Sequence, residues 1–390
     1  MRAIPPTAEL VIIGGGVVGA ATAFYAARAG LRPVILEARP RLCTLTTPAS
    51  TGAFRLQFDN EEETRLVGRS AYLFNNFAEI TGQTGYDLGL RVQGYLWLTT
   101  EEEGRERQRR LVARQHAWGQ TDIEMLDGDE VRRRFPYVGP DVIGGRFRAG
   151  DGFLDPKALT LGLARASGAV ICTDTQVLGF KIGAGRVRAV ETARGRIETE
   201  RAVIAAGPLS GVVAAFAGLD LPLQTVVRQK VVMPEVPEVP AQAPMTIDDD
   251  TGAHWRPALR GAYLLYTDPE TPPTPPAQDV PTDHRFAFRL LDPASPVSVA
   301  RVTPFWRDVW QRASAHWLLQ AGQYTMTPDR RPLIGATAVE GLFLNTGYSG
   351  HGIMGSPAGS ELLIDVMTGR RRENPFRPGR AFLPREHDRL

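Results

Sequence analysis

The chain has 390 residues, of which 43% are hydrophobic and 23% charged, so it is neither disordered nor fibrous and is long enough for two packed domains. Its 45 Lys and Arg residues nearly balance 43 Asp and Glu residues, and this formal charge of +2 argues against nucleic-acid binding. The two cysteines, Cys43 and Cys172, form no CxxC pair. We therefore expect no metal site, no disulfide framework and a reducing compartment.

The first residues, Met1 to Thr7, lack the apolar core and cleavage site of a signal peptide, and we expect a cytoplasmic protein. The stretch from Leu10 to Ala27 is uncharged and long enough to suggest a membrane span, but Gly14, Gly15 and Gly16 interrupt it. We therefore predict a strand, a turn and a helix there, and no membrane span.

The first elements form a βαβ unit. Residues 9–13 are apolar without alternation, which is typical of a strand buried on both faces of a parallel sheet. The alanine-rich stretch 17–28 predicts a helix that ends at Gly30, and residues 33–36 predict a second strand that ends at Glu37.

The turn of this unit carries the pattern Gly14-x-Gly16-x-x-Gly19. In a dinucleotide-binding turn, the first glycine permits the turn, the second lets the backbone approach a pyrophosphate, and the third lets helix and strand touch. Glu37 stands where an acid accepts hydrogen bonds from an adenosine ribose. The sequence predicts an adenine dinucleotide site; the alternative is a glycine-rich turn with no ligand.

The middle of the chain leaves this pattern and then returns to it. Helices are predicted over 61–80, 101–118 and 127–135, followed after Gly150 by a helix (157–167), a strand (170–173), a hairpin (177–192) and a buried strand (202–206). An NAD-dependent dehydrogenase would continue directly with further βα units. The interrupted layout therefore favours FAD over NAD.

The stretch 221–320 has a different sequence pattern. It contains alternating strands such as 262–267 and a helix over 305–315, and two proline-rich segments, 234–244 and 269–281, interrupt it. Because proline does not fit the interior of a sheet or a helix, we expect both segments to be exposed loops.

Five further motifs make the chain resemble a known family. They are Ser50 to Phe58 (STGAFRLQF), Asp151 to Pro156 (DGFLDP), Ala202 to Gly207 (AVIAAG), Tyr324 to Asp329 (YTMTPD) and Gly347 to Met354 (GYSGHGIM). Together they resemble the FAD-dependent D-amino acid oxidase and sarcosine oxidase superfamily. The stretch from Gly52 to Phe77 is most similar to sarcosine oxidase and the sarcosine oxidase β subunit, with proline and dimethylglycine dehydrogenases close by and glycine oxidase further away.

The resemblance implies an α/β fold with two domains. A Rossmann-like FAD-binding domain would be discontinuous, formed by residues 1–85, 150–220 and 322–390. A second, α+β substrate domain, built on an antiparallel sheet that roofs the flavin ring, would comprise residues 86–149 and 221–321.

The resemblance also implies a set of cofactor-binding residues. Ser50, Thr51 and Gly52 would lie along the flavin, Val177 would contact adenine unless it only packs in its strand, and the glycine-rich run after Gly347 would bring backbone amides to the flavin. The expected cofactor-binding set is Gly14, Gly16, Val18, Gly19, Glu37, Ser50, Thr51, Gly52, Val177, Gly207, Gly347, Gly350, His351, Gly352 and Ile353.

Three residues are candidates for a catalytic role. Arg55 would lie against the flavin face away from substrate and stabilise the reduced, anionic ring; its apolar neighbours argue against a solvated surface arginine. Tyr324 would be an aromatic wall of the substrate pocket, or else a core tyrosine. His351 is a candidate base, although shaping the loop is its expected role.

The chain also departs from the sarcosine oxidase pattern. Gly322 stands where monomeric sarcosine oxidases have a flavin-linking cysteine, so we expect non-covalent FAD, with Cys43 as the other cysteine that could form a link. Met354 replaces a carboxylate-binding lysine, and no lysine lies near 267–271, where one promotes the oxygen reaction in that group. Arg55, Arg228 and Arg256 are unranked candidates for carboxylate binding.

These observations predict FAD-dependent oxidation of the C–N bond of a small N-substituted amino acid such as sarcosine, with hydride transfer to flavin N5, imine hydrolysis and reoxidation by oxygen. The alternatives are a dehydrogenase or catalytic subunit that passes electrons to a partner subunit, a glycine or D-amino acid oxidase, and a flavin-binding protein without turnover.

Overall fold

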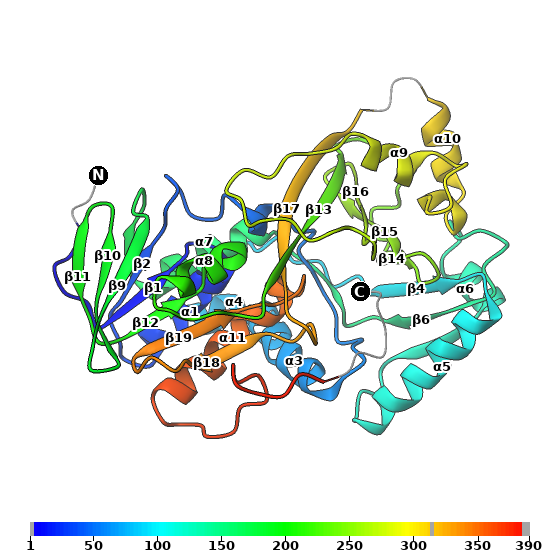
Figure 1. Cartoon of the computed structure of the whole chain (residues 1–390). Helices are drawn as coiled ribbons and strands as arrows, with labels where there is room; N and C mark the ends of the chain where they lie inside the picture. Colours follow the sequence, from blue (N-terminus) through cyan, green and yellow to red (C-terminus); the bar gives the residue numbers. More distant parts are fainter. Residues whose placement is uncertain (1–3, 313–315, 384–390) are drawn as a thin grey trace.

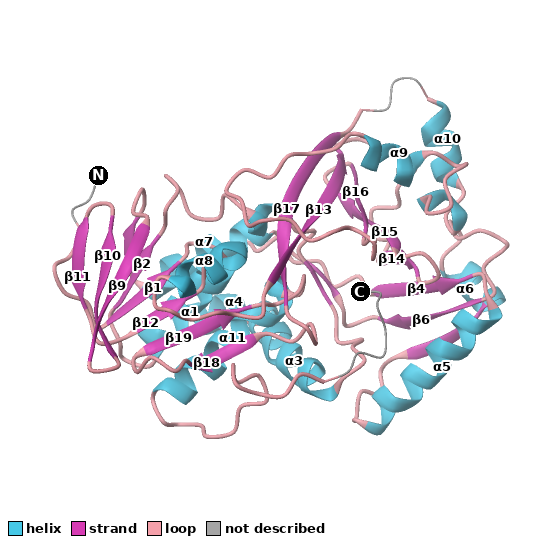
Figure 2. Ribbon diagram, viewed as in Figure 1, coloured by secondary structure: helices cyan, strands magenta, loops and turns pink. Residues whose placement is uncertain are grey.

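A computed structural model describes residues 4–312 and 316–383, which form two lobes (Figures 1 and 2). The long strands β13 (Gln224–Met233) and β17 (Leu318–Met326) stand where the lobes meet, and Figure 1 shows them between the first-lobe helices and the α9–α10 region. This junction contains the candidate site.

The first lobe is built on a six-stranded sheet. In spatial order its strands are β18 (Leu333–Ala336), β19 (Leu342–Thr346), β12 (Ala202–Ile204), β1 (Leu10–Ile13), β2 (Pro33–Leu36) and β8 (Val170–Cys172). Neighbouring strands are parallel except β18 and β19. Every residue of β1 and β2 is buried, as their unbroken apolar sequences predict.

Different layers cover the two faces of this sheet. On one face lie α1 (Val17–Arg28) and α11 (Gly352–Met367), with α7 (Pro156–Ser167) against α1. On the other lie α8 (Ser210–Ala215), after the short helix η1 (Gly207–Leu209), and a three-stranded sheet of β9 (Val177–Gly183), β10 (Arg186–Thr192) and β11 (Gly195–Glu198). The buried alanines of α1 let it approach the sheet closely, and the Asp155 carboxylate caps α7 by accepting from two backbone N–H groups.

The second lobe is built on an eight-stranded sheet. Its order is β17, β13, β16 (Gly261–Tyr266), β15 (Ala253–Ala258), β14 (Met245–Asp248), β4 (Tyr95–Thr99), β6 (Gly144–Arg148) and β5 (Glu124–Asp127). Only β14 and β4 are parallel among the paired strands described, so the expected antiparallel sheet has one parallel step.

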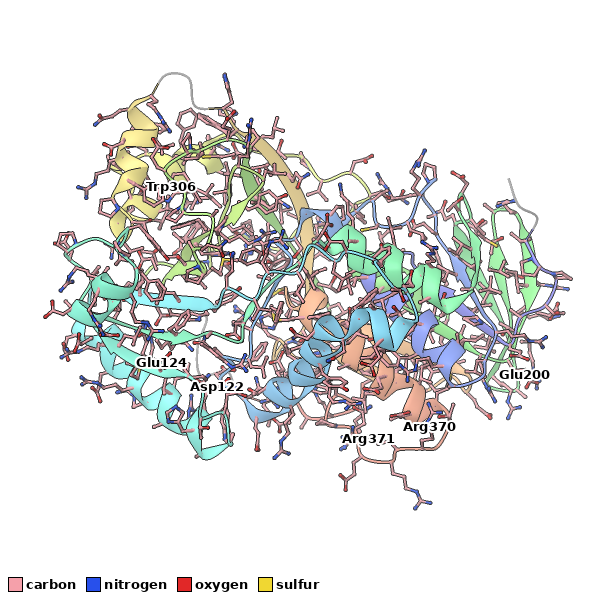
Figure 3. All side chains as sticks on the ribbon, turned by 180° about the vertical axis from the view of Figure 1, so that it is seen from behind. Asp122, Glu124, Glu200, Trp306, Arg370 and Arg371 are labelled. Atoms are coloured by element: carbon pink, nitrogen blue, oxygen red, sulfur yellow. The ribbon has the colours of Figure 1, made fainter. Side chains whose placement is uncertain are left out.

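Helices pack against the second sheet in two places. α9 (Arg285–Leu291), η2 (Val299–Arg301) and α10 (Phe305–Gln311) surround Trp255 and Trp306, and Figure 3 labels Trp306 in the α10 region. α5 (Glu102–Ala117) and α6 (Gly128–Arg134) lie beside β5 and β6, near Asp122 and Glu124 in Figure 3. The side of the sheet that carries Arg228 and Lys230, here named the inner side, faces the first lobe, because Lys230 donates to the carbonyls of Pro48 and Ser50.

The remaining elements lie mainly between β2 and β4 in the sequence. They are α2 (Thr46–Ala49), β3 (Ala53–Phe54), which pairs with β7 (Gly152–Phe153), α3 (Glu61–Asn75) and α4 (Phe77–Thr81). The helix predicted over 61–80 is thus broken at Asn76, and residues 313–315 of the helix predicted over 305–315 lie outside the described residues.

Two sequence expectations need correction. The first proline-rich segment, 234–244, is not a solvated loop throughout, because Val236, Val239 and Ala243 are buried in the core around Trp255. The expected domain boundary between residues 321 and 322 falls within β17, which pairs with β13 along its whole length. The second segment, 269–281, is exposed or half-buried as expected.

Candidate active site

The glycine turn after β1 opens into a cavity, here named the turn cavity. Its walls come from residues 13–18, 36–39, 43–47, 175–177, 205–209, 212–213, 216 and 278. Gly14 has φ +117°, and a Cβ there would lie 2.4 Å from the carbonyl oxygen of Ala205. A Cβ on Gly19 would lie 1.9 Å from the Gly14 carbonyl oxygen, so α1 touches the strand only because residue 19 is glycine.

Glu37 closes the turn cavity at the end of β2. Its carboxylate accepts hydrogen bonds from the backbone N–H groups of Gly15 (2.7 Å) and Arg39 (2.8 Å). Carboxylate oxygens have further lone pairs, so Glu37 can also accept from a sugar hydroxyl in the cavity. The Arg39 guanidinium meanwhile donates to the carbonyl of Gln278 (2.7 Å), which attaches the second proline-rich segment to the rim.

A second cavity, the sheet cavity, lies between the glycine-rich run and the inner side of the second-lobe sheet. Its walls are Val17, Val18, Thr46, Thr47, Ala49, Ser50, Gly207, Pro208, Arg228, Gln229, Leu265, Gly322, Gln323, Tyr324, Thr325, Thr346–Gly350, Gly352 and Ile353. Six of these residues, Val17, Val18, Thr46, Thr47, Gly207 and Pro208, also line the turn cavity. The two cavities therefore form one elongated groove along the N-terminal end of α1.

Most of the predicted cofactor-binding residues line this groove. Gly14, Gly16, Val18, Glu37, Val177 and Gly207 line the turn cavity, and Val18, Ser50, Gly207, Gly347, Gly350, Gly352 and Ile353 line the sheet cavity. Gly19 lies behind the wall as a packing residue. Thr51, Gly52 and His351 are not among the lining residues. Gly52 instead packs against the Leu154 carbonyl, 1.9 Å from where its Cβ would be, and the Thr51 carbonyl accepts from Arg256.

Tyr324 supplies an aromatic wall of the sheet cavity. Its ring lies so close to Gly350 that a Cβ there would approach Cε2 to 2.5 Å, and Gly350 also has φ +99°. Only glycine fits this position without displacing the ring. Burial raises the pKa of the Tyr324 phenol, so the side chain stays neutral.

Arg55 is buried behind this groove, with 4% of its surface exposed. Its guanidinium lies over the ring of Phe58 (4.8 Å) and near those of Trp97 (5.6 Å) and Tyr95 (6.0 Å). These contacts agree with the burial expected from its apolar neighbours. Arg55 does not line the sheet cavity in the described residues, so its electrostatic role stays a prediction.

His351 contacts both Arg55 and the carboxylate of Glu63. Its Nε2 lies 3.4 Å from an Arg55 Nη2, and its Nδ1 lies 3.3 Å from a Glu63 oxygen. The ring also packs edge-on against Phe58. Both ring nitrogens therefore have protein partners, an arrangement that holds Arg55 in place; a role as catalytic base stays a prediction.

Comparison with known proteins identifies the family of this site. The family model described as FAD dependent oxidoreductase matches residues 9–366. The chain belongs to the FAD dependent oxidoreductase family. Human mitochondrial sarcosine dehydrogenase is 27% identical over 386 residues, which cover 95% of this chain and 40% of that protein. Rat mitochondrial dimethylglycine dehydrogenase is 31% identical over 238 residues, which cover 60% of this chain and 27% of that protein.

Solved structures show the same fold along nearly the whole chain. L-proline dehydrogenase from P. horikoshii superposes with a TM-score of 0.83 at 25% identity, covering 96% of this chain and 98% of that one. Glycine oxidase from Geobacillus kaustophilus superposes with a TM-score of 0.82 at 24% identity and covers 97% of this chain and 100% of that one. By contrast, the chain spans 40% or less of the two mitochondrial relatives.

The geometry of the groove fits FAD, the cofactor of this flavoprotein family. The turn cavity offers backbone N–H groups at the start of α1 for a pyrophosphate and Glu37 for a ribose. A Cβ on Gly16 would meet only Thr47 Oγ1, at 3.1 Å, so its backbone faces open cavity. The sheet cavity continues along the same groove, where the flavin half would extend.

A covalent link to FAD has no support among the cysteines. Gly322 lines the sheet cavity and has no thiol, and Cys43 lines the turn cavity, where the adenosine half of FAD would lie. Burial raises the pKa of the Cys43 thiol to about 11, so it is protonated near neutral pH. The expectation of non-covalent FAD is consistent with both positions.

The inner side of the sheet carries a buried lysine, Lys230, to which the sequence analysis gave no role. Lys230 on β13 is 2% exposed, its Nζ donates to the carbonyls of Ser50 (2.8 Å) and Pro48 (3.2 Å), and its strand partner is Leu265. Lys230 thus contacts the segment 48–50, part of which lines the sheet cavity, although the sequence has no lysine near 267–271. Burial lowers the pKa of Lys230 to about 7.

Residues missed by the sequence reasoning come from distant segments. Thr46, Thr47 and Pro208 line both cavities, and Gln278 lines the turn cavity. The proline-rich composition around Gln278 signalled a loop, but no local pattern pointed to its contact with Arg39. Met354, discussed as a carboxylate-site position, is buried in the core with Phe54 and Phe74.

The described residues contain neither a metal-binding cluster nor a membrane-spanning helix. In residues 4–312 and 316–383, no group of three or more His, Cys, Asp or Glu side chains could hold a metal ion. Over the same ranges, none of the helices combines the length and apolar character needed to cross a bilayer.

Proposed function

We propose that this flavoprotein oxidises the C–N bond of a small N-substituted amino acid, with sarcosine as the simplest substrate. The observation that carries the proposal is the wall of the sheet cavity, where the neutral ring of Tyr324 and one guanidinium face the same space. An aromatic wall suits an N-methyl group, and a cation suits a carboxylate. The names of the mitochondrial relatives, sarcosine and dimethylglycine dehydrogenase, support the same substrate class.

Bound FAD supplies the hydride acceptor, flavin N5, for the substrate C–H bond. Among the described residues, the sheet cavity is lined by no Asp, Glu, His or Lys, and burial raises the pKa of its two phenols, Tyr324 and Tyr348. The protein thus offers no general base there. The substrate amine must reach the cavity already neutral, since its lone pair has to be free as the hydride leaves, and water then hydrolyses the imine.

The remaining residues position these groups. Gly350 lets the Tyr324 ring lie against the glycine-rich run, and β13 and β17 hold the sheet face opposite it. The buried cation Arg55 would stabilise negative charge that develops in the groove. Thr46 and Thr47 of α2 line both the turn cavity and the sheet cavity.

The rate of anaerobic flavin reduction tests the substrate class. We expect sarcosine, N,N-dimethylglycine or proline to reduce the bound flavin faster than D-alanine or glycine. Faster reduction by D-alanine or glycine than by all three N-alkylated compounds would instead assign a D-amino acid or glycine oxidase.

There are two candidates for the electron acceptor. Direct reoxidation by oxygen is our first proposal, and the dehydrogenase names of the relatives favour a second, transfer to a partner protein or other acceptor. Oxygen consumption at the rate of substrate turnover supports the first. Turnover that needs an added artificial acceptor supports the second.

A further inference from the structure

We propose that Arg228 binds the carboxylate of the amino acid substrate in the sheet cavity, next to the aromatic wall formed by Tyr324. This inference rests on the proposed function and deepens it, because it names the group that selects amino acids over simple amines. Arg228 lies on β13, and its strand neighbour across β17 is Gly322, two residues from Tyr324.

The charge of the cavity wall supports this assignment. Arg228 is the one cation among the described residues that line the sheet cavity, and no Asp or Glu lines it. No carboxylate of the described residues forms an ion pair with Arg228. Burial lowers the pKa of its guanidinium, and the charge of Asp268, which pairs with Arg289, opposes this shift without forming an ion pair with Arg228. The lining of the cavity thus carries a positive charge and no carboxylate.

The hydrogen bonds of Arg228 also support carboxylate binding. A guanidinium has five N–H donors. In the described part of the chain, the Arg228 side chain donates one long bond, from Nη1 to the carbonyl of Val227 at 3.3 Å, and its buried Nε has no partner. Buried donors without acceptors are costly, and a carboxylate can satisfy two of them at once.

The structure also separates Arg228 from the other two arginine candidates. The Arg256 guanidinium donates to the Thr51 carbonyl from Nε (2.8 Å) and to the Pro257 carbonyl from Nη1 (2.7 Å), and it does not line the sheet cavity. Arg55 is enclosed by three aromatic rings and is also absent from the lining. Arg228 is therefore the candidate with both access to the cavity and free donors.

The position of Tyr324 places the aromatic wall close to the Arg228 guanidinium. The Arg228 guanidinium carbon lies 5.9 Å from the centre of the Tyr324 ring. One small α-amino acid can therefore contact both, with its carboxylate on Arg228 and its N-alkyl group on the ring. Longer amines without a carboxylate lose the charged contact.

The test uses the FAD-loaded protein and a matched pair of compounds. Sarcosine and sarcosinamide carry the same N-methylamine, but only sarcosine has a carboxylate. For Arg228→Gln, we expect the apparent dissociation constant of sarcosine during anaerobic reduction to rise by about 30-fold or more, since truncating one partner of a buried charge pair has a large effect. The constant for sarcosinamide should change less than about threefold, and Arg228→Lys should recover part of the loss for sarcosine.

A surface substitution provides the control. Arg260→Gln changes an arginine whose side chain is 80% exposed and paired with Glu235, and it should leave both compounds unaffected. An equal loss for sarcosine and sarcosinamide in Arg228→Gln, or no loss for sarcosine, would overturn the proposal. If Arg228→Gln does not retain FAD, the same comparison is made with Arg228→Lys, which keeps the charge but not the forked donors.

A binding measurement without turnover separates this inference from the proposed function. Acetate, followed through the visible absorption of bound FAD, should bind the wild type and bind Arg228→Gln about 30-fold more weakly. If no N-alkylated amino acid reduces the wild type but acetate binding depends on Arg228, the carboxylate site stands and the substrate assignment fails. If sarcosine reduces both proteins with equal affinity, the substrate assignment stands and the carboxylate site fails.

Discussion

Lys230 allows a quantitative prediction about stability and pH. This lysine is 2% exposed, and its ammonium lies over the ring of Tyr263 (4.4 Å) as well as near two backbone carbonyls. Burial, followed by the positive charges of Arg256 and Lys157 and opposed by Asp155, lowers its pKa from 10.5 to about 7. Such a gap corresponds to a free energy on the order of 5 kcal/mol, at about 1.4 kcal/mol per pH unit.

The direction in which the Lys230 contribution to stability changes with pH follows from the protons bound by the folded and unfolded states. Below pH 7, Lys230 is charged in both states, and the folded protein bears the full desolvation penalty. Between pH 7 and 10.5 the unfolded state binds the extra proton, so the contribution of Lys230 to stability improves as pH rises. Replacing Lys230 by Met removes this dependence. We therefore expect Lys230→Met to gain most in stability, relative to wild type, below pH 7, and progressively less toward pH 10.

Chemical unfolding at pH 6 and pH 9.5, with the same excess of free FAD, measures the effect. Loss of the contacts to the Pro48 and Ser50 carbonyls changes the stability of the variant equally at both pH values. A change in the stability difference between pH 6 and pH 9.5 therefore reports the charge of Lys230. Lys181→Met on the exposed β9 position is the control and should show no such difference. The reasoning is refuted if the stability difference between Lys230→Met and wild type is the same at both pH values.

Four further predictions concern the core, the rim, the cofactor link and the substrate. Asp151 is fully buried and accepts from the Leu56 N–H and from Arg148, so Asp151→Asn should lower the free energy of unfolding by about 3 kcal/mol or more; a loss below 1 kcal/mol in chemical unfolding would contradict this. Arg39→Ala removes the contact to Gln278 at the rim of the turn cavity and should speed FAD dissociation, measured by the fluorescence of released FAD; an unchanged rate would argue against that contact. Acid precipitation should release all FAD, and flavin that stays with the polypeptide in wild type but not in Cys43→Ser would show a covalent link. The anaerobic reduction rate at low substrate should rise with pH until the amine is deprotonated, whereas a rate that falls with pH would require a protonated amine or a base absent from the cavity lining.

The sequence predicted the parts of this site that depend on local pattern. Buried strands, the alanine-rich helix and the glycine turn are adjacent in the chain, so their hydrophobic pattern and spacing determine them. The positions of Gly14 and Glu37 in the turn cavity agree with this reasoning. The break of the predicted 61–80 helix at Asn76 was missed, because an asparagine within a helical pattern is only a weak signal.

Other features depend on strands that are distant in sequence. Lys230 lies opposite Leu265 only because β13 and β16 pair, and Arg228 faces the cavity only because β13 presents alternate side chains to its two sides. Thr51 and Gly52 are predicted cofactor-binding residues that do not line either cavity. They follow Ser50 in the motif, but the chain turns there, so the Thr51 carbonyl faces Arg256 and Gly52 packs against Leu154.

The most direct test of the account is a single anaerobic mixing of the FAD-loaded protein with sarcosine. We expect the visible absorption of the flavin to bleach and one formaldehyde to appear for each FAD reduced, as hydrolysis of the N-methyl imine requires. A flavin that stays oxidised with sarcosine, N,N-dimethylglycine and proline, while a chemical reductant still bleaches it, would contradict the account.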